Sequence, residues 1–557
     1  MKPPNFFQCG ERISRIISFA VTLTTFLMGI LLIEPVAWAG GTVTSPTEPS
    51  LRAAMTGGGT VTFTFDGTIT LGNTIISSLN TVLDASGHQI TISGSNSVRV
   101  FYVNTNVIFT VINLTIANGR SDSGAGIFND GGTVTATNSH FVGNRAQGAP
   151  GADDSPGQNG YGGAVYNSGV LNAINCTFIW NSVVGGAGGF GLYGPYTGGD
   201  GGVGDGGAIC NFGALTMVGC TLASNSACGG AGGVGGSPNR GQPYGLRGGD
   251  GGAGGHGNGG TLFNGGSAYM VNDTFALNSG AGGHGGGGGG GGAPGNPDYS
   301  GGNGGNGGAG GAGYSAIYDS NGQCYLTNGT LAMNWATAGI GGAGGSGGRV
   351  TDPGFPPHPG NPGLSGTNGS AGGGIRTTGG LLDNTLLSAN APSNCSGIIT
   401  DAGHNLSSDS SCAFTGVGSL NNTDAKLGPL ADNGGPTLTV ALLSGSPAIN
   451  AGASAGAPTT DQRGVTRPQG PGVDIGAFEY QYIPMFSSAE FQTPTSFRLQ
   501  MSGLLPAQAF KLQTSTNLLN WSDLTNFVAG SSDVYEFVDC NPGNCKARFY
   551  RLKFSTP

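Results

Sequence analysis

The sequence predicts an all-β chain built as a parallel β-helix, a solenoid of stacked coils, followed by a small C-terminal β-sandwich. Two observations favour this class. A block of about twenty residues recurs five times with a looser sixth copy, as expected of a stack of similar coils. Apolar and polar residues also alternate at period 2 between turns rich in Gly, Asn and Ser.

The clearest copies of the block span 162–181 and 206–225, and fainter copies start at Gly124, Gly259, Gly313 and Gly373. Aligning them predicts three inward apolar columns: Val134, Leu171, Leu215, Ala268 and Cys324; Ala136, Ala173, Met217, Met270 and Leu326; and Phe141, Phe178, Leu222, Phe275 and Leu331. Two polar columns accompany them: Asn129, Asn167, Asn211, Asn264 and Asp319; and Asn144, Asn181, Asn225, Asn278 and Asn334. Their amides either stack in hydrogen-bonded ladders or fill left-handed turn positions.

Glycine-dominated insertions separate the blocks at one fixed point of the repeat. They span 145–161, 182–205, 226–258, 279–312 and 335–372, and they lengthen from 17 to 38 residues along the chain. Because all leave from one corner of the coil, we expect them to emerge on one side. Two alternatives stay open for their structure: disordered loops, or extended polyglycine-type helices packed side by side.

The N-terminal part combines an export signal with a solenoid lid. Residues 1–39 predict a secretory signal, with a basic start, an apolar run from Ile16 to Ile33, and Ala37-Trp38-Ala39 as the cleavage motif. An uncleaved membrane anchor is the alternative. Residues 40–119 then predict a short helix over Pro49–Met55, which covers the open end of the solenoid, and the first coils. We therefore expect an exported protein, extracellular or at the cell surface, with no transmembrane segment after cleavage.

Composition narrows the partners. The chain has 115 glycines, only 9% charged residues and a net charge of −9, and it shows no basic patch with interleaved aromatics. Nucleic acid is therefore not an expected partner. Extracellular polysaccharide or cell-surface components are the partners that an exported chain of this kind predicts.

The cysteines predict disulfides in an exported protein. Of ten cysteines, Cys9 lies in the predicted signal, which leaves nine. Cys395 with Cys412 and Cys540 with Cys545 each close a short loop. Cys176 and Cys220 share a column of adjacent blocks, where strands about 4.8 Å apart permit either a disulfide or a stack of buried free thiols.

Two resemblances add to these patterns. Gly162-Gly163-Ala164-Val165 and Gly206-Gly207-Ala208-Ile209, together with Phe141-Val142-Gly143-Asn144 and Phe178-Ile179-Trp180-Asn181, resemble the GGA(I/L/V) and FxxN repeats of chlamydial polymorphic outer-membrane proteins. The likeness covers about residues 120–390. It implies a right-handed parallel β-helix of pectin-lyase-like fold on a surface protein. No C-terminal autotransporter barrel follows, so the resemblance does not extend to self-export.

Residues 391–482 resemble the choice-of-anchor Q domain of bacterial secreted β-helix proteins. The likeness rests on the runs 427–437 and 445–452, and on Thr460-Asp461-Gln462-Arg463-Gly464 and Asp474-Ile475-Gly476-Ala477-Phe478-Glu479. Asp461, Arg463, Asp474 and Glu479 concentrate charge here, which predicts a buried ion-pair network, with a ligand site as the alternative. Residues 483–557 are similar to C-terminal modules of secreted bacterial proteins, implying a surface or carbohydrate attachment module, or an inert cap.

A search for catalytic groups finds only weak candidates. Between Glu48 and Glu479 there is no glutamate, so acids and bases in the solenoid must come from Asp, Arg, His and Tyr. A calcium-dependent lyase needs Asp ligands and an Arg base, and a glycosidase needs two carboxylates. Asp122 near Arg120, and Asp153 with Asp154, are the candidate pieces, and solvated turn carboxylates are the alternative interpretation.

Metal and cofactor sites are predicted to be absent, with three weak candidates for metal ligands. His256 and His284 lie in equivalent insertions, and a pair of neutral imidazoles can bind a transition metal. Asp205 ends a run that resembles a calcium-binding nonapeptide but comes one residue early. No glycine-rich run ends in Lys followed by Ser or Thr, so no phosphate loop is expected.

The sequence thus predicts a secreted or cell-surface non-enzymatic β-helix protein, adhesin-like or structural, that presents a glycine-rich face. The alternative is a polysaccharide lyase or glycoside hydrolase on the same scaffold. Ice binding is a remote third, since Thr62, Thr64, Thr68 and Thr70 are not expected to recur as a lattice across coils.

Overall fold

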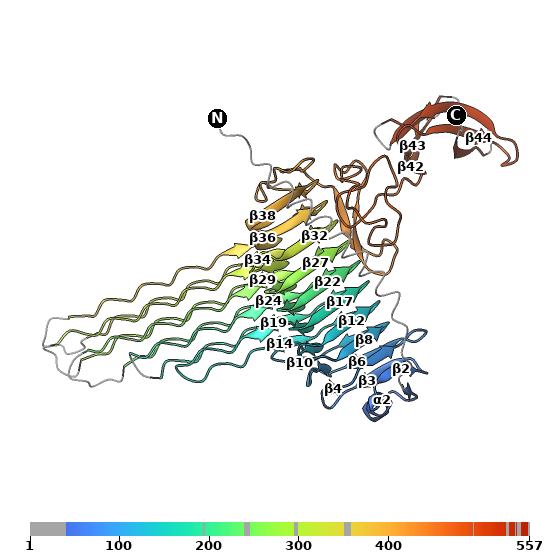
Figure 1. Cartoon of the computed structure of the whole chain (residues 1–557). Helices are drawn as coiled ribbons and strands as arrows, with labels where there is room; N and C mark the ends of the chain where they lie inside the picture. Colours follow the sequence, from blue (N-terminus) through green and yellow to red (C-terminus); the bar gives the residue numbers. More distant parts are fainter. Residues whose placement is uncertain are drawn as a thin grey trace, which may run out of the picture.

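The computed structural model describes residues 40–192, 195–238, 245–294, 299–349, 358–493, 495–530, 534–540, 542 and 547–554. The predicted signal at 1–39 lies outside this range. The described chain is nearly all-β, and short parallel strands stack into a solenoid with small antiparallel sheets at the C-terminal end, as predicted (Figure 1).

Four parallel sheets form the solenoid. The longest, sheet A, contains β1 (Thr42–Val43), β2 (Gly59–Phe63), β4 (Ile75–Ser77), β5 (Thr81–Asp84), β7 (Phe101–Val103), β8 (Ile108–Ile112), β11 (Ile127–Asn129), β12 (Thr133–Thr137), β16 (Val165–Asn167), β17 (Val170–Ile174), β21 (Ile209–Asn211), β22 (Ala214–Val218), β26 (Leu262–Asn264), β27 (Ser267–Val271), β31 (Ile317–Asp319), β32 (Cys324–Thr327), β36 (Ile375–Asp383) and β38 (Cys395–Gly403). Sheet B contains β3 (Gly67–Thr70), β6 (Ile90–Ser93), β9 (Leu114–Ala117), β13 (His140–Val142), β18 (Thr177–Ile179), β23 (Thr221–Ala223), β28 (Thr274–Ala276), β33 (Thr330–Ala332), β37 (Leu386–Ser388) and β39 (Leu406–Ser407).

Sheets C and D lie where the glycine-rich insertions leave and rejoin the solenoid. Sheet C contains β10 (Arg120–Ser121), β14 (Arg145–Gln147), β19 (Ser182–Val184), β24 (Ser226–Cys228), β29 (Ser279–Ala281) and β34 (Trp335–Thr337). Sheet D contains β15 (Gly160–Tyr161), β20 (Gly204–Asp205), β25 (Gly257–Asn258), β30 (Gly313–Tyr314) and β35 (Ala371–Gly372). Each insertion therefore starts from sheet C and returns into sheet D.

The predicted columns of the core are confirmed by the strand register. Val134 pairs with Leu171, Leu171 with Leu215, and the column continues through Ala268 to Cys324. The other two apolar columns are in register in the same way, and all three are buried. Stacking is what allows such short strands to fold, because each coil alone would bury too little apolar surface.

Both predicted polar columns form continuous hydrogen-bonded ladders. In the first, the Asn129 Nδ2 donates to Asn167 Oδ1 at 2.7 Å, and the same contact repeats up to Asp319. In the second, each amide also accepts from the backbone N–H of the preceding coil's asparagine, from Asn144 up to Asn390. These side chains pair the polar groups of buried turns, so they are structural.

A short helix, α2 (Glu48–Met55), covers the first coil, as the sequence predicts. Thr47 caps its N-terminus by accepting a hydrogen bond from the Ser50 N–H, and Leu51 is fully buried against the coil below. Among the residues that the structure describes, α2 is the only helix, and none is long and apolar enough to cross a membrane.

The C-terminal part has two components. Residues 425–480, here called the strap, include the antiparallel pair β40 (Leu427–Ala431) and β41 (Thr439–Leu442) and contact sheet B. The last segment forms two three-stranded antiparallel sheets, β42 (Met485–Thr493), β43 (Ser496–Ser502) and β46 (Tyr535–Asp539), and β45 (Ser522–Val528), β44 (Ala509–Ser515) and β47 (Phe549–Phe554). Leu499 and Met501 of the first sheet and Phe510 and Leu512 of the second share one core.

Candidate functional site

The five glycine-rich insertions form one ordered body, here called the slab. Each insertion has an outgoing arm and a return arm, and Figure 1 shows them as long parallel traces on one side of the solenoid. The outgoing arms are 148–152, 185–191, 229–237, 282–292 and 339–348, and the return arms are 155–160, 198–204, 248–257, 301–313 and 360–370. Of the two alternatives that the sequence left open, the structure has the packed extended helices.

The outgoing arms form one layer and the return arms form a second, and backbone hydrogen bonds join the two layers to each other. One ladder passes from Gly369 to Gly339, Gly311, Gly283, Gly255, Gly230, Gly202, Gly186 and Gln158, each N–H donating to the next C=O at 2.8 or 2.9 Å. Three residues along, a second ladder repeats from Gly366 to Ser155. This three-residue repeat is that of an extended helix of the polyproline II type, which has no internal hydrogen bonds and bonds only to its neighbours.

Further backbone hydrogen bonds join arms of successive insertions within each layer. Together with the ladders between layers, they determine which residue of each three-residue repeat points outward. In the outgoing layer the Gly188 N–H donates to Ala231 O and the Gly232 N–H to His284 O. In each Gly-Gly-X triplet, both glycines face neighbouring arms, and only the third residue, X, projects from the layer. The slab therefore displays one side chain in three on each of its two faces.

The glycines are required by the closeness of the arms. A Cβ added to Gly255 would lie 1.9 Å from Gly202 O, and one added to Gly254 would lie 1.9 Å from Gly283 O. No Cβ atom approaches a carbonyl oxygen so closely. The second glycine of a triplet thus faces the preceding insertion, while the first glycine of a return-arm triplet faces the next insertion.

Side chains close both edges of the slab. The first insertion has no predecessor, and its second-glycine positions hold Ala149, Ala152, Ser155 and Gln158. The last return arm has no successor, and its first-glycine positions hold Pro359, Pro362, Ser365 and Asn368, all exposed. The two prolines carry no N–H, and the Asn368 Oδ1 accepts the Gly341 N–H at 3.0 Å. A further arm can therefore add at neither edge.

The return face, formed by the X residues of the return arms, is mostly polar. Its polar side chains are Asn159, Asp200, Arg247, Asp250, His256, Asn303, Asn306, His358, Asn361, Thr367 and Ser370, and its apolar ones are Pro156, Val203, Ala253, Ala309, Ala312 and Leu364. Several of these side chains accept the outward N–H of the X residue on the next arm. Asp200 accepts from Ala253 at 2.7 Å, and Asn303 accepts from Asn361 at 2.8 Å.

The outgoing face, formed by the X residues of the outgoing arms, is mostly apolar. Its side chains are Gln147, Pro150, Asp153, Val184, Ala187, Phe190, Cys228, Ala231, Val234, Ser237, Ala281, His284, Ala293, Thr337, Ile340, Ala343, Ser346 and Arg349, and Gly287 and Gly290 occupy two further X positions. Asp, Glu, Lys and Arg are absent from 184–192, 228–237, 281–292 and 337–348. The two faces of one rigid body thus differ sharply in chemistry.

The weak catalytic candidates make separate local contacts. Asp122 lies 3.3 Å from Arg99 and not beside Arg120, whose guanidinium donates to Gln147. Asp154 accepts the Leu192 N–H at 3.2 Å, and Asp153 is exposed in the first insertion. Asp154 therefore links the tips of two insertions, and Asp122 pairs with a cation on the solenoid wall.

His256 and His284 project from opposite layers of the slab, so they do not face one another. Each Nδ1 accepts a backbone N–H of the next arm, His256 from Ala312 at 2.8 Å and His284 from Ile340 at 3.0 Å. Asp205 lies buried at the root of the slab and accepts from Asn258 at 2.9 Å. Across the described residues, no three His, Cys, Asp or Glu side chains are grouped to hold a metal ion.

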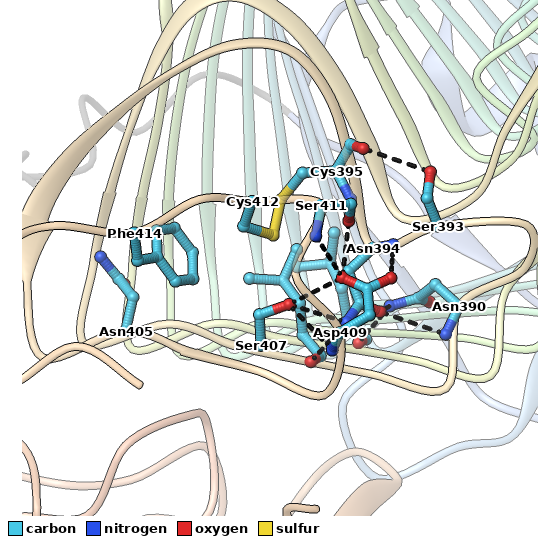
Figure 2. Close-up of a disulfide and its surroundings, with 12 residues drawn as sticks. Asn390, Ser393, Asn394, Cys395, Asn405, Ser407, Asp409, Ser411, Cys412 and Phe414 are labelled. Atoms are coloured by element: carbon cyan, nitrogen blue, oxygen red, sulfur yellow. Dashed lines mark hydrogen bonds between the residues drawn. A yellow bond between two sulfur atoms is a disulfide. The ribbon is translucent and has the colours of Figure 1, made fainter. Parts of the chain in front are cut away.

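Cys395 and Cys412 form a disulfide near the upper end of the solenoid (Figure 2). Beside it, Asp409 accepts hydrogen bonds from Ser411, Asn394 and Ser407. Burial opposes ionisation there, but these bonds outweigh it and lower the pKa of Asp409. The carboxylate thus organises the loop that the disulfide closes.

The other predicted cysteine pairs differ. Cys176 and Cys220 are buried free thiols in register, and each donates to the carbonyl two residues earlier in its own strand. Cys540 is an exposed free thiol, and its expected partner Cys545 lies outside the described residues. Burial raises the pKa of Cys220 far above its ordinary value, so this thiol stays protonated and unreactive.

The charges of the strap form a buried network. Arg463 pairs with Asp461, and Arg467 lies 2.8 Å from Glu479, with both side chains of the second pair about 1% exposed. The Glu479 carboxylate also accepts the N–H groups of Gln469 and Asp474. The carboxylate oxygens are thereby occupied within the strap, which fits a structural network.

A column of threonines on sheet B, which sequence reasoning missed, binds the strap. Contrary to our expectation, threonines do recur across coils: Thr68, Thr91, Thr115, Thr177, Thr221, Thr274 and Thr330 are in register, interrupted by His140. In the C-terminal part of this threonine column, Gln462 of the strap donates to Thr221 and accepts from Thr274. A shallow hollow of about 270 Å³ lies at the border between the part of the column that the strap covers and the part that it leaves open, beside His140, Thr177 and Asp432.

Comparison with protein-family models, curated proteins and solved structures gives no match for this chain. The parallel β-solenoid with asparagine ladders therefore rests on the strand register and hydrogen bonds alone.

Proposed function

We propose that this chain is a secreted or cell-surface non-enzymatic protein, adhesin-like or structural, that uses the slab to contact extracellular polysaccharide. One observation carries the proposal: a rigid slab displays polar side chains in a regular array on its return face. Carboxylates, amides, imidazoles and hydroxyls of that face can exchange hydrogen bonds with sugar hydroxyls over an extended area. The resemblance of the repeats to polymorphic outer-membrane proteins, and of residues 391–482 to choice-of-anchor Q domains, supports the surface setting.

The rigidity of the slab favours binding over a wide, shallow surface. Its arms are held by main-chain bonds in every triplet, so little conformational entropy is lost when a ligand docks. The predicted signal at 1–39 and the Cys395–Cys412 disulfide are consistent with export. The C-terminal sheets at 485–554 are the candidate for attachment to the cell.

A glycan array probed with the purified chain tests the proposal. The informative variant combines Asn361→Ala with Thr367→Ala, because both residues are exposed on the return face and their side chains make no hydrogen bond to another described residue. The matched control combines Thr337→Ala with Ser346→Ala on the outgoing face. We expect the first pair to weaken glycan binding by about tenfold or more, and the control to leave it unchanged. Equal binding by all three proteins would refute the return face as the contact surface.

The alternative that the sequence left, a polysaccharide lyase or hydrolase, predicts turnover. A screen of pectic and uronate polymers, with and without calcium, decides between the two functions. Turnover abolished by Asp122→Ala or Asp154→Ala would replace the binding function with catalysis. Thermal hysteresis by the purified chain would instead establish the remote alternative, ice binding.

A further inference from the structure

The outgoing face of the slab is a flat apolar surface that stays open within the described chain. Phe190 is 65% exposed, Ile340 61% and Val234 44%. Large apolar side chains so exposed on one rigid body are typical of an interaction site. The lattice around them cannot rearrange to hide them, because each neighbouring glycine is hydrogen-bonded to an adjacent arm.

We propose that this face is a self-association surface, on which a second copy of the chain docks face to face in a two-fold dimer. The inference concerns a different face from the one proposed to bind glycans, and neither depends on the other. The two-fold axis runs in the plane of contact, parallel to the arms, so that the two solenoids are antiparallel.

Shape is the first argument for a second copy. The X residues form columns across the arms, and successive columns are about 9 Å apart because three residues of an extended helix advance by that length. Two identical faces share this spacing without adjustment, and an axis parallel to the arms places each column over its own copy. A foreign surface has no reason to carry the same period.

The order of residues within the columns is the second argument. On the second to fifth outgoing arms, one column runs Ala187, Ala231, His284, Ile340, and the next runs Phe190, Val234, Gly287, Ala343. The axis of the proposed dimer passes between the third and fourth arms, so the first arm, with Pro150 and Asp153, lies outside the contact. The two-fold axis reverses the order of the arms, so each small residue of one copy meets a larger one of the other. Val234 then lies over Gly287, and Ile340 lies over Ala187. A Cβ built on Gly287 meets only one atom within 4 Å, at 3.7 Å, so there is room for the valine.

Charge and area agree with this occupant. Across 184–192, 228–237, 281–292 and 337–348 the face has no Asp, Glu, Lys or Arg, and the charged residues Asp153 and Arg349 lie at its rim, so two copies bring no like charges together at the contact although the chain as a whole carries −9. Four arms about 30 Å long, spaced about 4.8 Å apart, offer roughly 600 Å² per copy. The total of about 1,200 Å² is at the lower end of stable specific interfaces.

The other surfaces of the slab are unsuited to self-association. Both edges are closed by side chains where another arm would have to approach. The return face carries Asp200 and Asp250, whose carboxylates would lose water in a contact between two slabs. The outgoing face is thus the one slab surface on which a second slab fits.

Sedimentation velocity of the purified chain tests the proposal. We expect a dimer at concentrations of about 10 to 100 μM, given an interface of this size. Val234→Asp combined with Ile340→Asp should give a monomer, because it buries uncompensated carboxylates at the contact. The control combines Ala309→Asp with Leu364→Asp on the return face and should remain a dimer. Far-UV circular dichroism and thermal melting must show that all three proteins are folded alike.

Cross-linking tests the register independently of affinity. Val234 and Gly287 are neighbours on adjacent arms of one slab, so the two cysteines are placed in separate chains. A chain carrying Val234→Cys, mixed with a chain carrying Gly287→Cys, should give disulfide-linked dimers under mild oxidation, since these positions face one another across the axis. The control mixture, Ala309→Cys with Leu364→Cys, should stay uncrosslinked. A wild-type chain that is monomeric throughout the range overturns the proposal, and so does a dimer that survives the aspartates or dissociates equally with the control pair. None of these results alters the glycan-binding proposal.

Discussion

Single buried residues decide the fold of this protein, and the asparagines show how. Asn225 donates to Asn278 Oδ1, Phe178 O and Thr261 Oγ1, and its own Oδ1 accepts from Asn181. The amide therefore satisfies polar groups of three successive coils in a setting without water. Its neighbours above and below repeat the arrangement, which fixes the register of the stack one residue at a time.

Asp205 makes stability depend on pH. Burial raises the pKa of this carboxyl from 3.8 to about 7, although the hydrogen bond from Asn258 works against the shift. Between these two values the folded chain holds a proton that the unfolded chain has released. The free energy of unfolding therefore falls as pH rises through this window, by up to about 1.4 kcal/mol per pH unit for one group.

We expect Asp205→Asn to flatten that pH dependence while preserving the fold, since the amide has the same shape and needs no proton. Thermal melting from pH 4 to pH 8 is the measurement, and the wild-type melting temperature should be higher near pH 5 than near pH 8. Asp200→Asn, at an exposed position of the same insertion, is the matched control. An unchanged slope in Asp205→Asn would show that this carboxyl does not titrate in the window.

At this scale the sequence predicted much of the core. The block alignment placed Leu171, Ala173 and Phe178 inward because their spacing repeats in every coil. It missed the threonine column, since the coils before residue 120 do not carry the block and His140 interrupts the column. The buried state of Asp205 was also missed, because its burial comes from neighbouring coils and not from its own segment.

Among the elements, the slab depends on backbone approach and not on a side-chain core. Its bonds are exchanged between arms far apart in sequence, as in the Gly308 N–H donating to Gly286 O, 22 residues away, and the Gly286 N–H donating to Gly252 O, 34 residues away. Sequence alone gave the composition and the shared exit corner of the insertions. It could not decide between order and disorder, because the deciding quantity is the contact with the next insertion, which no single insertion encodes.

Gly308→Ala should open the slab locally, because its Cβ would lie 1.9 Å from Gly252 O. Hydrogen exchange of the amides of 282–292 and 301–311 is the measurement. We expect slow exchange in the wild type and a strong acceleration around Gly252, Gly286 and Gly308 in the variant. Ser365→Ala is the control, since this edge position already carries a side chain. Complete fast exchange across these amides in the wild type would contradict the ordered slab.

For the whole molecule, the strap joins the C-terminal region to the middle of the solenoid. Gln462 is 2% exposed and donates to Cys220 O, Thr221, Thr437 and Leu438 O. One side chain thus pairs two coils with two segments of the strap. The concentration of charged residues in this segment predicted its buried network, but not the face of the solenoid on which the segment lies.

Gln462→Ala should loosen the strap, because it leaves several buried polar groups without partners at a cost of about 2 to 4 kcal/mol. Limited proteolysis should then cut within 425–480 faster than in the wild type, while the solenoid stays resistant. Gln469→Ala, in the same segment, is the control. Equal cleavage rates for the two variants would show that Gln462 is dispensable for docking.

The closed edges of the slab have a consequence for how the protein can change over generations. The residues that close the lattice occur only in the first and last insertions, and the middle insertions repeat the same Gly-Gly-X unit. Duplicating or deleting a middle block therefore changes the width of the slab by one pair of arms while both borders stay intact. Recombination between the similar middle repeats can thus yield broader or narrower versions of the protein, each complete from the moment it arises.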